Sequence, residues 1–160
     1  MAPSDIEVRE AGVADAGAIA ELRRLWSSGE DPDFVGRMAA WLESEGDRRT
    51  TWLATRGGSA VGLASLFEYR RMPLPGRPDS RWGYVGNMFV REELRSHGIG
   101  SALLAAVLAA ADERGYVRLV LSPTERAVPF YVRAGFAVPA DPAAADGLLV
   151  RPGARGSGPG

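Results

Sequence analysis

The chain has 160 residues, a hydrophobic content of 46% and a formal net charge of −1, which suits one domain with a sizeable core. This charge gives no basic field for nucleic acid, and the absence of cysteine excludes disulfides and thiolate metal sites while leaving the redox compartment undecided. The single histidine argues against a histidine-based metal site or a Ser-His-Asp triad. We find no leader-like segment and no apolar run near the ~20 residues that span a bilayer, so we expect a cytoplasmic protein that binds neither metal nor membrane.

The first part of the chain predicts one strand and two helices. Residues 6–10 alternate apolar and polar side chains, as a half-buried strand does, and residues 14–27 carry apolar side chains at helical spacing. A second helix is expected to run to about Glu43, with Asp31 as its N-cap and Pro32 at its first position.

Large apolar side chains recur along the second helix at helical spacing, namely Phe34, Met38, Trp41 and Leu42. Such a stripe usually packs into the core. The alternative is that some of these side chains form the wall of an acceptor pocket.

Strands are predicted at residues 51–55 and 60–69, joined by a hairpin turn of the sequence Arg-Gly-Gly-Ser. The segment 70–81 contains three prolines and a glycine and is expected to be a loop. A further strand should begin at Trp82 or Gly83 and end at Val90.

The apolar stripe of residues 99–114 predicts a buried helix that ends at Gly115. A strand is expected at 116–121, and the order strand, helix, strand implies a parallel pair with a right-handed crossover. A short helix with Ser122 or Thr124 as its cap should follow.

That short helix should run to Ala134 and stop at Gly135. Short strands are expected at 136–138 and 147–151. We assign residues 1–151 to one domain and expect the Gly/Pro-rich tail, residues 152–160, to be disordered.

The segment Arg95–Ser101 (Arg-Ser-His-Gly-Ile-Gly-Ser) stands where a strand hands over to the long helix. Glycine allows positive φ, and the N–H groups of a first helical turn have no intrahelical partner, so this turn can cradle a diphosphate. It is not a Walker loop, which needs Lys-Ser/Thr after its glycines, and Leu103 stands where a dinucleotide fingerprint has its third glycine. Read alone, the turn is also compatible with a plain tight turn.

Two motifs resemble the GNAT superfamily of N-acetyltransferases. The acetyl-CoA motif Gln/Arg-x-x-Gly-x-Gly/Ala is matched by Arg95, Gly98 and Gly100, and a later Tyr-x-x-x-Gly-Phe element by Tyr131 to Phe136. The resemblance implies an α/β fold with a central, mostly antiparallel sheet, a splayed parallel pair, and helices on both faces. It also implies acetyl-CoA as cosubstrate and a coenzyme site made of Met88, Phe89, Val90, Arg95, Ser96, His97, Gly98, Ile99, Gly100, Ser101, Ser122, Phe130, Tyr131 and Arg133.

For catalysis, the resemblance implies direct attack of an amine on the thioester, with Tyr131 as the acid that protonates the leaving thiolate. His97 is a phosphate neighbour or a bystander rather than a base. The histone-acetylating branch carries a glutamate where Tyr84 stands here. Glu68 or Asn87 could replace that base, although a lone strand-end carboxylate is often only solvated.

The acceptor is expected to be a primary amine of a small molecule or a peptide, and the protein a monomer or homodimer. The acidic segment Glu30–Asp33 would favour a cationic amine, whereas the basic loop 70–81 argues the other way. A rival reading is a CoA-binding regulatory or interaction module with little turnover.

Overall fold

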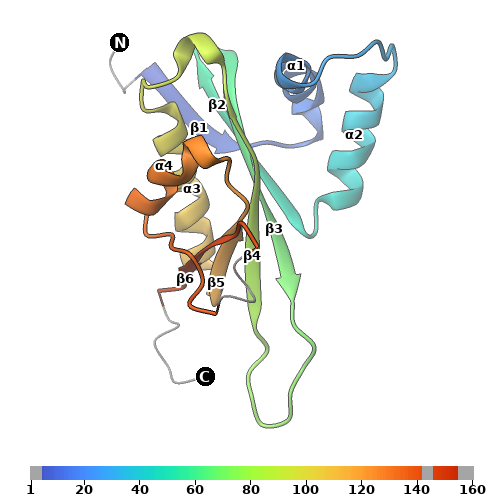
Figure 1. The fold of residues 1–160 in the computed structure, drawn as a ribbon. Helices are drawn as coiled ribbons and strands as arrows, with labels where there is room; N and C mark the ends of the chain where they lie inside the picture. Colours follow the sequence, from blue (N-terminus) through green and yellow to red (C-terminus); the bar gives the residue numbers. More distant parts are fainter. Residues whose placement is uncertain (1–4, 142–145, 155–160) are drawn as a thin grey trace. The chain divides into compact units, whose positions relative to one another are not determined.

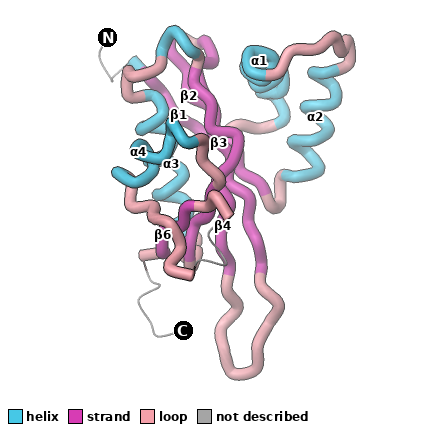
Figure 2. Tube along the Cα trace, viewed as in Figure 1, coloured by secondary structure: helices cyan, strands magenta, loops and turns pink. Residues whose placement is uncertain are grey.

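The computed structural model describes residues 5–141 and 146–154, which form a mixed α/β fold (Figures 1 and 2). Six strands form one sheet in the order β1-β2-β3-β4-β5-β6. The pairs β1–β2 and β5–β6 are antiparallel and β4–β5 is parallel, which confirms the predicted fold class and parallel pair. The elements are β1 (Ile6–Glu10), α1 (Ala16–Trp26), α2 (Phe34–Glu45), β2 (Arg49–Arg56), β3 (Ser59–Arg70), β4 (Arg81–Val90), α3 (Ile99–Glu113), β5 (Arg118–Leu121), α4 (Val128–Arg133) and β6 (Leu149–Pro152).

The chain divides into two compact units, Met1–Leu66 with Asn87–Leu108, and Phe67–Gly86 with Ala109–Gly160. The first unit holds β1, β2, α1 and α2, and its core is a cluster of buried aliphatic side chains, Ile19, Leu22, Leu53 and Leu63. Each such side chain contributes about 1.5–3 kcal/mol by leaving water.

Both early helices start later than predicted. Residues Val13–Asp15 form a 3-10 turn, so α1 begins only at Ala16. The Asp15 carboxylate accepts the Gly12 N–H at 2.8 Å and pairs with Arg9 at 2.7 Å. These bonds stabilise the 3-10 turn, which occupies residues that were predicted to begin the helix.

The prediction that Asp31 caps the second helix is wrong, because α2 begins at Phe34 with Asp33 at the N-cap position. Asp31 instead closes the preceding turn: its Oδ1 accepts the Asp33 N–H at 3.1 Å and its carbonyl accepts the Phe34 N–H at 3.2 Å. Its carboxylate is also paired with Arg37. Asp31 therefore organises the turn and not the helix end.

The hairpin between β2 and β3 turns at two glycines with positive φ, 55° at Gly57 and 81° at Gly58. This is the conformation of a type I′ turn, which matches the twist of the flanking strands. Farther along β3, a Cβ on Gly62 would lie 2.9 Å from the Phe89 carbonyl oxygen and 3.1 Å from Leu103 Cδ1. Only glycine lets β3 approach β4 and α3 this closely.

The second unit begins with the outer half of the β3–β4 hairpin, whose connecting loop is prominent in Figure 1. Tyr69 and Trp82 stack across the two strands with ring centroids 4.3 Å apart and planes 8° apart. The Pro-rich connection beyond them is irregular, as predicted, and Met72 at its start is 85% exposed.

Glycines end α3 and α4 at the predicted places. Gly115 has a φ of 69°, and the N–H of Tyr116 bonds to the Ala111 carbonyl at 3.0 Å, as in a Schellman motif. Gly135 ends α4 with a φ of 96°. The loss of the helical direction at these residues allows the chain to return to the sheet.

The C-terminal strands differ in part from the prediction. Residues 136–138 form no strand, and only Ala137 makes an antiparallel bridge, to Val150. β6 includes Pro152, the first residue of the expected tail, and the N–H of Gly153 bonds to the Val117 carbonyl at 3.0 Å. Residues 155–160 of that tail lie outside the described part of the chain.

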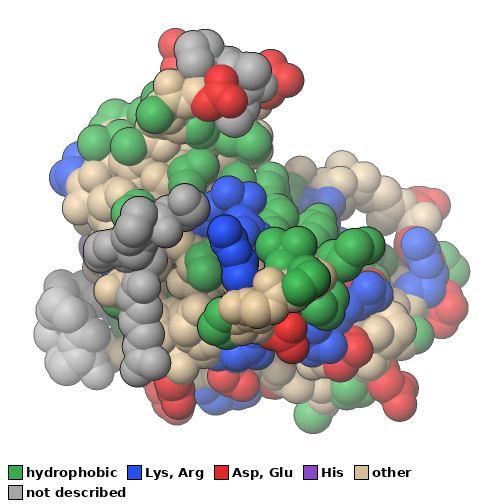
Figure 3. Space-filling view, turned by 90° about the horizontal axis from the view of Figure 1, so that it is seen from below, with side chains coloured by type: hydrophobic (Ala, Val, Ile, Leu, Met, Phe, Trp, Pro, Cys, Tyr) green, Lys and Arg blue, Asp and Glu red, His purple; other side chains and the backbone are tan. Residues whose placement is uncertain are grey.

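The surface view in Figure 3 shows basic and acidic side chains in small groups on the same face, as the net charge of −1 leads one to expect. Within the described ranges, every helix is too short or too polar to cross a membrane.

Candidate active site

The inner end of β4 is irregular at Asn87, which has a φ of 52° inside the strand. A left-handed residue in a strand is typical of a β-bulge, and asparagine tolerates this conformation better than most residues. The Asn87 side chain donates from Nδ2 to Ser65 Oγ on β3 at 3.1 Å. The strand then continues through Met88, Phe89 and Val90, and a 3-10 turn at Glu92–Leu94 leads to the predicted glycine turn.

The connection from β4 to α3 is braced by its own side chains. Arg95 donates from Nε to the Val90 carbonyl at 3.1 Å. His97 Nδ1 lies 3.1 Å from the Leu94 carbonyl oxygen and 2.9 Å from that of Arg95. Because both partners are acceptors, Nδ1 carries the hydrogen, and the imidazole holds the loop in shape.

The glycine turn has the geometry of an anion cradle. Ser96 and Gly98 have φ values of 67° and 84°, and the first helical hydrogen bond runs from Ala102 N–H to the Gly98 carbonyl at 3.0 Å. The N–H groups of residues 99–101 therefore have no acceptor within the helix. Ile99 anchors the turn because its side chain is buried, and a Cβ at Gly98 would meet nothing within 4 Å. These features suit an incoming diphosphate.

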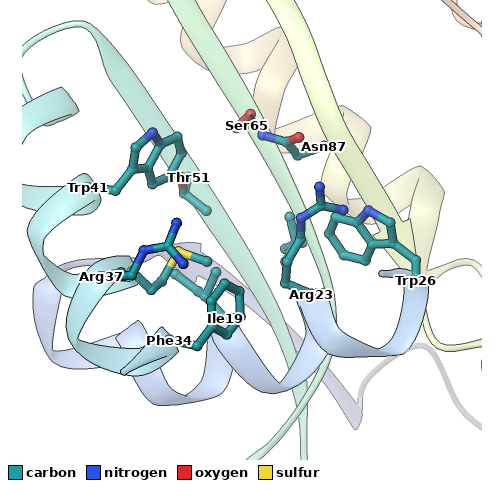
Figure 4. A pocket seen from close by; sticks show the side chains of 11 residues that line it. Ile19, Arg23, Trp26, Phe34, Arg37, Trp41, Thr51, Ser65 and Asn87 are labelled. Carbon is teal, nitrogen blue, oxygen red and sulfur yellow. Dashed lines mark hydrogen bonds between the residues drawn. The ribbon is translucent and has the colours of Figure 1, made fainter. Parts of the chain in front are cut away.

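A pocket of about 330 Å³ lies in the same unit (Figure 4). Polar groups from the strands, Thr51, Ser65 and Asn87, lie opposite side chains of α1 and α2. The lining residues are Ile19, Arg23, Trp26, Phe34, Arg37, Met38, Trp41, Thr51, Leu63, Ser65 and Asn87. This size suits a small ligand.

The apolar stripe of α2 both packs against the core and lines the pocket, the two alternatives that the sequence left open. Phe34, Met38 and Trp41 line the pocket, while Met38 and Leu42 also pack against the aliphatic core. Three of the four side chains therefore line a pocket, and its use as the acceptor pocket stays a prediction. Sequence reasoning missed Arg23, although its place one turn before Trp26 on α1 puts both on one helix face.

Phe89 connects the pocket to the strand segment before the cradle. Its ring centroid lies 4.3 Å from that of Trp26, which lines the pocket. The Arg95 guanidinium carbon lies 5.8 Å from the Phe89 ring centroid. One continuous set of contacts thus runs from the pocket wall to the first residue of the glycine turn.

Tyr131 lies in the second unit, on α4, and its side chain is 7% exposed. Its ring packs edge-to-face on Phe130 and Phe136, with centroids 5.0 and 5.8 Å away. No described residue hydrogen-bonds the Tyr131 hydroxyl. Burial raises the pKa of this phenol, so it stays protonated at neutral pH and can act as a proton donor. Ser122 and Arg133 are exposed.

Glu68 belongs to the second unit and is not among the residues that line the pocket. Its carboxylate accepts hydrogen bonds from Arg70, Arg81 and Tyr116. Burial opposes its ionisation, but the bonds from Arg70 and Tyr116 and the charge of Arg81 outweigh burial and lower the pKa of Glu68. These contacts favour an anchoring role for the carboxylate.

Comparison with known proteins agrees with this geometry. Residues 17–136 match the Acetyltransferase (GNAT) family. The chain is 33% identical over 117 residues to an aminoglycoside N(6')-acetyltransferase type 1 of Stenotrophomonas maltophilia, covering 72% of this chain and 73% of that one.

Two solved structures share the fold. An acetyltransferase of the GNAT family from Streptococcus pneumoniae aligns with a TM-score of 0.71 and 22% identity, over 92% of this chain and 99% of that one. A predicted acetyltransferase with acetyl-CoA from Clostridium acetobutylicum aligns with a TM-score of 0.68 and 20% identity, over 85% and 92% of the two chains. Because the family match includes both the glycine turn and Tyr131, this protein belongs to the GNAT family and is an acyltransferase.

Proposed function

We propose that the protein transfers an acetyl group from acetyl-CoA to a primary amine of a small molecule or peptide, by direct attack of the amine. The observation that carries this proposal is the continuity between the anion cradle and the pocket within one unit. Asn87 lines the pocket, and the end of β4 and the 3-10 turn Glu92–Leu94 connect it to the turn that begins at Arg95. A ligand with a diphosphate at one end and a reactive group at the other matches this layout.

The binding roles follow from the exposed backbone. The free N–H groups of residues 99–101 bind the diphosphate, and Arg95 and His97 keep the turn in its binding shape. Backbone groups of Met88–Val90 pair with the amides of the pantetheine arm. When bound, acetyl-CoA supplies a thioester whose carbonyl carbon is the electrophile.

The acceptor nitrogen is held by the polar groups of the pocket, Thr51, Ser65 and Asn87. Its lone pair forms the new C–N bond as the C–S bond breaks. The described lining residues include no carboxylate and no histidine, so the attacking nitrogen, which becomes positively charged when the C–N bond forms, releases its excess proton to water and leaves a neutral amide.

Tyr131 donates the proton that the leaving thiolate takes up, because a buried phenol with a raised pKa holds its proton at neutral pH, and the phenolate then regains a proton from water. The assignment of Glu68 as a base stays a prediction, and its three hydrogen-bond partners support an anchoring role better.

The test measures binding and turnover separately. Calorimetry with acetyl-CoA should show binding at one site per chain. A thiol-release assay with a panel of primary amines should show amine-dependent release, with the acetylated amine identified by mass spectrometry. Absence of acetyl-CoA binding would refute the proposal, and binding with no amine-dependent release would identify the CoA-binding module instead.

A further inference from the structure

The two arginines that line the pocket differ in whether a carboxylate balances their positive charge. Arg23 and Arg37 both line it, and Figure 4 shows the two guanidinium groups projecting from α1 and α2 into the space below the strands. The Arg37 charge is balanced by an ion pair with Asp31. Of the acidic segment that was expected to attract a cationic amine, Asp31 is therefore paired within the protein, and none of its acids is among the residues that line the pocket.

A third guanidinium lies next to the pocket and is also balanced. Arg49 donates to Ser65 Oγ at 3.4 Å and lies 5.2 Å from the Trp41 ring centroid. Glu45 approaches the Arg49 guanidinium at 3.9 Å. The carboxylates of Asp31 and Glu45 are thus both occupied.

Arg23 differs, because no described residue forms an ion pair or hydrogen bond with its guanidinium. The group stacks on Trp26, with its carbon 4.4 Å from the ring centroid, and the side chain is half-buried. Stacking fixes the plane of the guanidinium and leaves its N–H donors available for a planar or tetrahedral anion. Its positive charge is the unbalanced one among the described groups at this pocket.

The remaining wall is apolar and aromatic. Ile19, Phe34, Met38 and Leu63 add hydrophobic surface to the rings of Trp26 and Trp41. A ligand that fills this space buries an apolar body while its polar ends reach the strands and Arg23. A polycation would bring its charges against two guanidinium groups without any carboxylate in the lining.

We infer that the acceptor is a small primary amine that carries an anionic group, a carboxylate or a phosphate, on an apolar body, and that Arg23 binds the anion. This inference rests on the proposed acetyl transfer and names the substrate class of its pocket. It also separates this protein from the relative that is named for aminoglycosides, which are polycationic.

The experiment uses amines that share one body and differ in charge. The probes are benzylamine, 4-(aminomethyl)benzamide, 4-(aminomethyl)benzoate and 4-(aminomethyl)phenylphosphonate, with phenylalanine and its amide as a second scaffold and kanamycin as the polycation. The anionic member of each set should show a kcat/KM at least tenfold above its neutral partner. The benzoate and phosphonate arms distinguish the two anion types.

Variants of Arg23 test the assigned contact. Arg23→Gln should raise KM for the preferred anionic amine about 10- to 100-fold and remove most of the preference for it over the neutral partner. Arg23→Lys should recover part of the loss, since it restores the charge but not the planar fork. Arg48→Gln removes a charge outside the pocket and should leave the preference intact.

The experiment distinguishes failure of this inference from failure of the proposed acetyl transfer. Transfer that favours neutral or cationic amines, or an anionic preference that survives Arg23→Gln, would overturn the inference while the transferase proposal stands. If no amine is acetylated, calorimetry with the benzoate, phosphonate and phenylalanine decides: binding that Arg23→Gln abolishes supports the anionic ligand without the proposed reaction. Absence of binding by all three refutes the inference as well.

Discussion

The hydroxyl of Tyr116 donates a hydrogen bond of 2.8 Å to the buried carboxylate of Glu68. Arg70 donates to the other carboxylate oxygen at 2.8 Å, and Arg81 donates to the first at 3.1 Å. This network joins the outer end of β3 to the start of β4 and to the connection between α3 and β5. A carboxylate saturated by three donors is placed to hold these segments together.

Glu68→Gln should lower the free energy of unfolding at neutral pH by about 1–3 kcal/mol, because charge-assisted hydrogen bonds to a buried group are lost. The pKa of Glu68 in the folded protein lies below its ordinary value of 4.5, so the ionised form contributes stability above that pH. The difference between wild type and variant should shrink as the pH falls through the folded pKa. Denaturant unfolding at pH 7 and at acid pH measures it.

The same variant tests the predicted base. An anchoring carboxylate leaves kcat within a few-fold of wild type at temperatures where the variant is folded. A fall of about 100-fold or more, with unchanged acetyl-CoA affinity, would instead establish Glu68 as a general base.

Tyr131→Phe should reduce kcat by about 100-fold or more, because the leaving thiolate then lacks its proton donor. The affinity for acetyl-CoA should change less than twofold. Since burial raises the pKa of the Tyr131 phenol, wild-type kcat should show no loss attributable to this group up to pH 9. Tyr116→Phe is the control, and it should lower stability without lowering kcat. Equal kcat for Tyr131→Phe and wild type would remove the acid assignment.

Gly100→Asp separates ligand binding from helix stability. An acid in the first turn of a helix is favourable by about 0.3–1 kcal/mol, so the melting temperature should not fall. The same charge repels a diphosphate at that turn and should weaken acetyl-CoA binding at least tenfold, as calorimetry can measure. Gly100→Asn is the uncharged match and should lose less affinity. Unaltered binding by the aspartate variant contradicts the cradle.

Gly62→Ala should destabilise the protein by about 1–3 kcal/mol, because its Cβ would meet the Phe89 carbonyl oxygen at 2.9 Å and Ile99 Cγ2 at 3.3 Å. Gly17→Ala provides the matched control. Gly17 lies in α1 with nothing within 4 Å of its Cβ position, so alanine there should stabilise by about 0.5–1 kcal/mol. Thermal melts of the two variants should move in opposite directions.

The parts of the fold that follow from local backbone chemistry could be predicted from the sequence. Gly57 and Gly58 take the positive φ that a two-residue hairpin needs, and Gly115 ends its helix for the same reason. Asp31 and Asp33 are both good caps, and the pattern alone does not choose between them. Asp33 takes the N-cap position, whereas Asp31 pairs with Arg37, six residues farther along the chain. Composition does not reveal that pairing.

The candidate site, too, has a part that could be predicted from the sequence and a part that could not. Gly98 and the start of α3 could be found from spacing, because the cradle is made of consecutive residues. Arg23 could not, because its role depends on Trp26 beside it and on strand residues far along the chain. Likewise, Glu68 looks like an ordinary surface acid until its contact with Tyr116 is known.

The Gly57–Gly58 turn has a consequence for the order of folding. It joins β2 and β3, whose central residues are buried on both sides of the turn. A hairpin closed by two residues costs little loop entropy, so these strands can pair early and offer a template for the later, more distant ones. Amide hydrogens of Leu53 and Leu63 should therefore exchange with solvent among the slowest in the chain, since their release requires global unfolding.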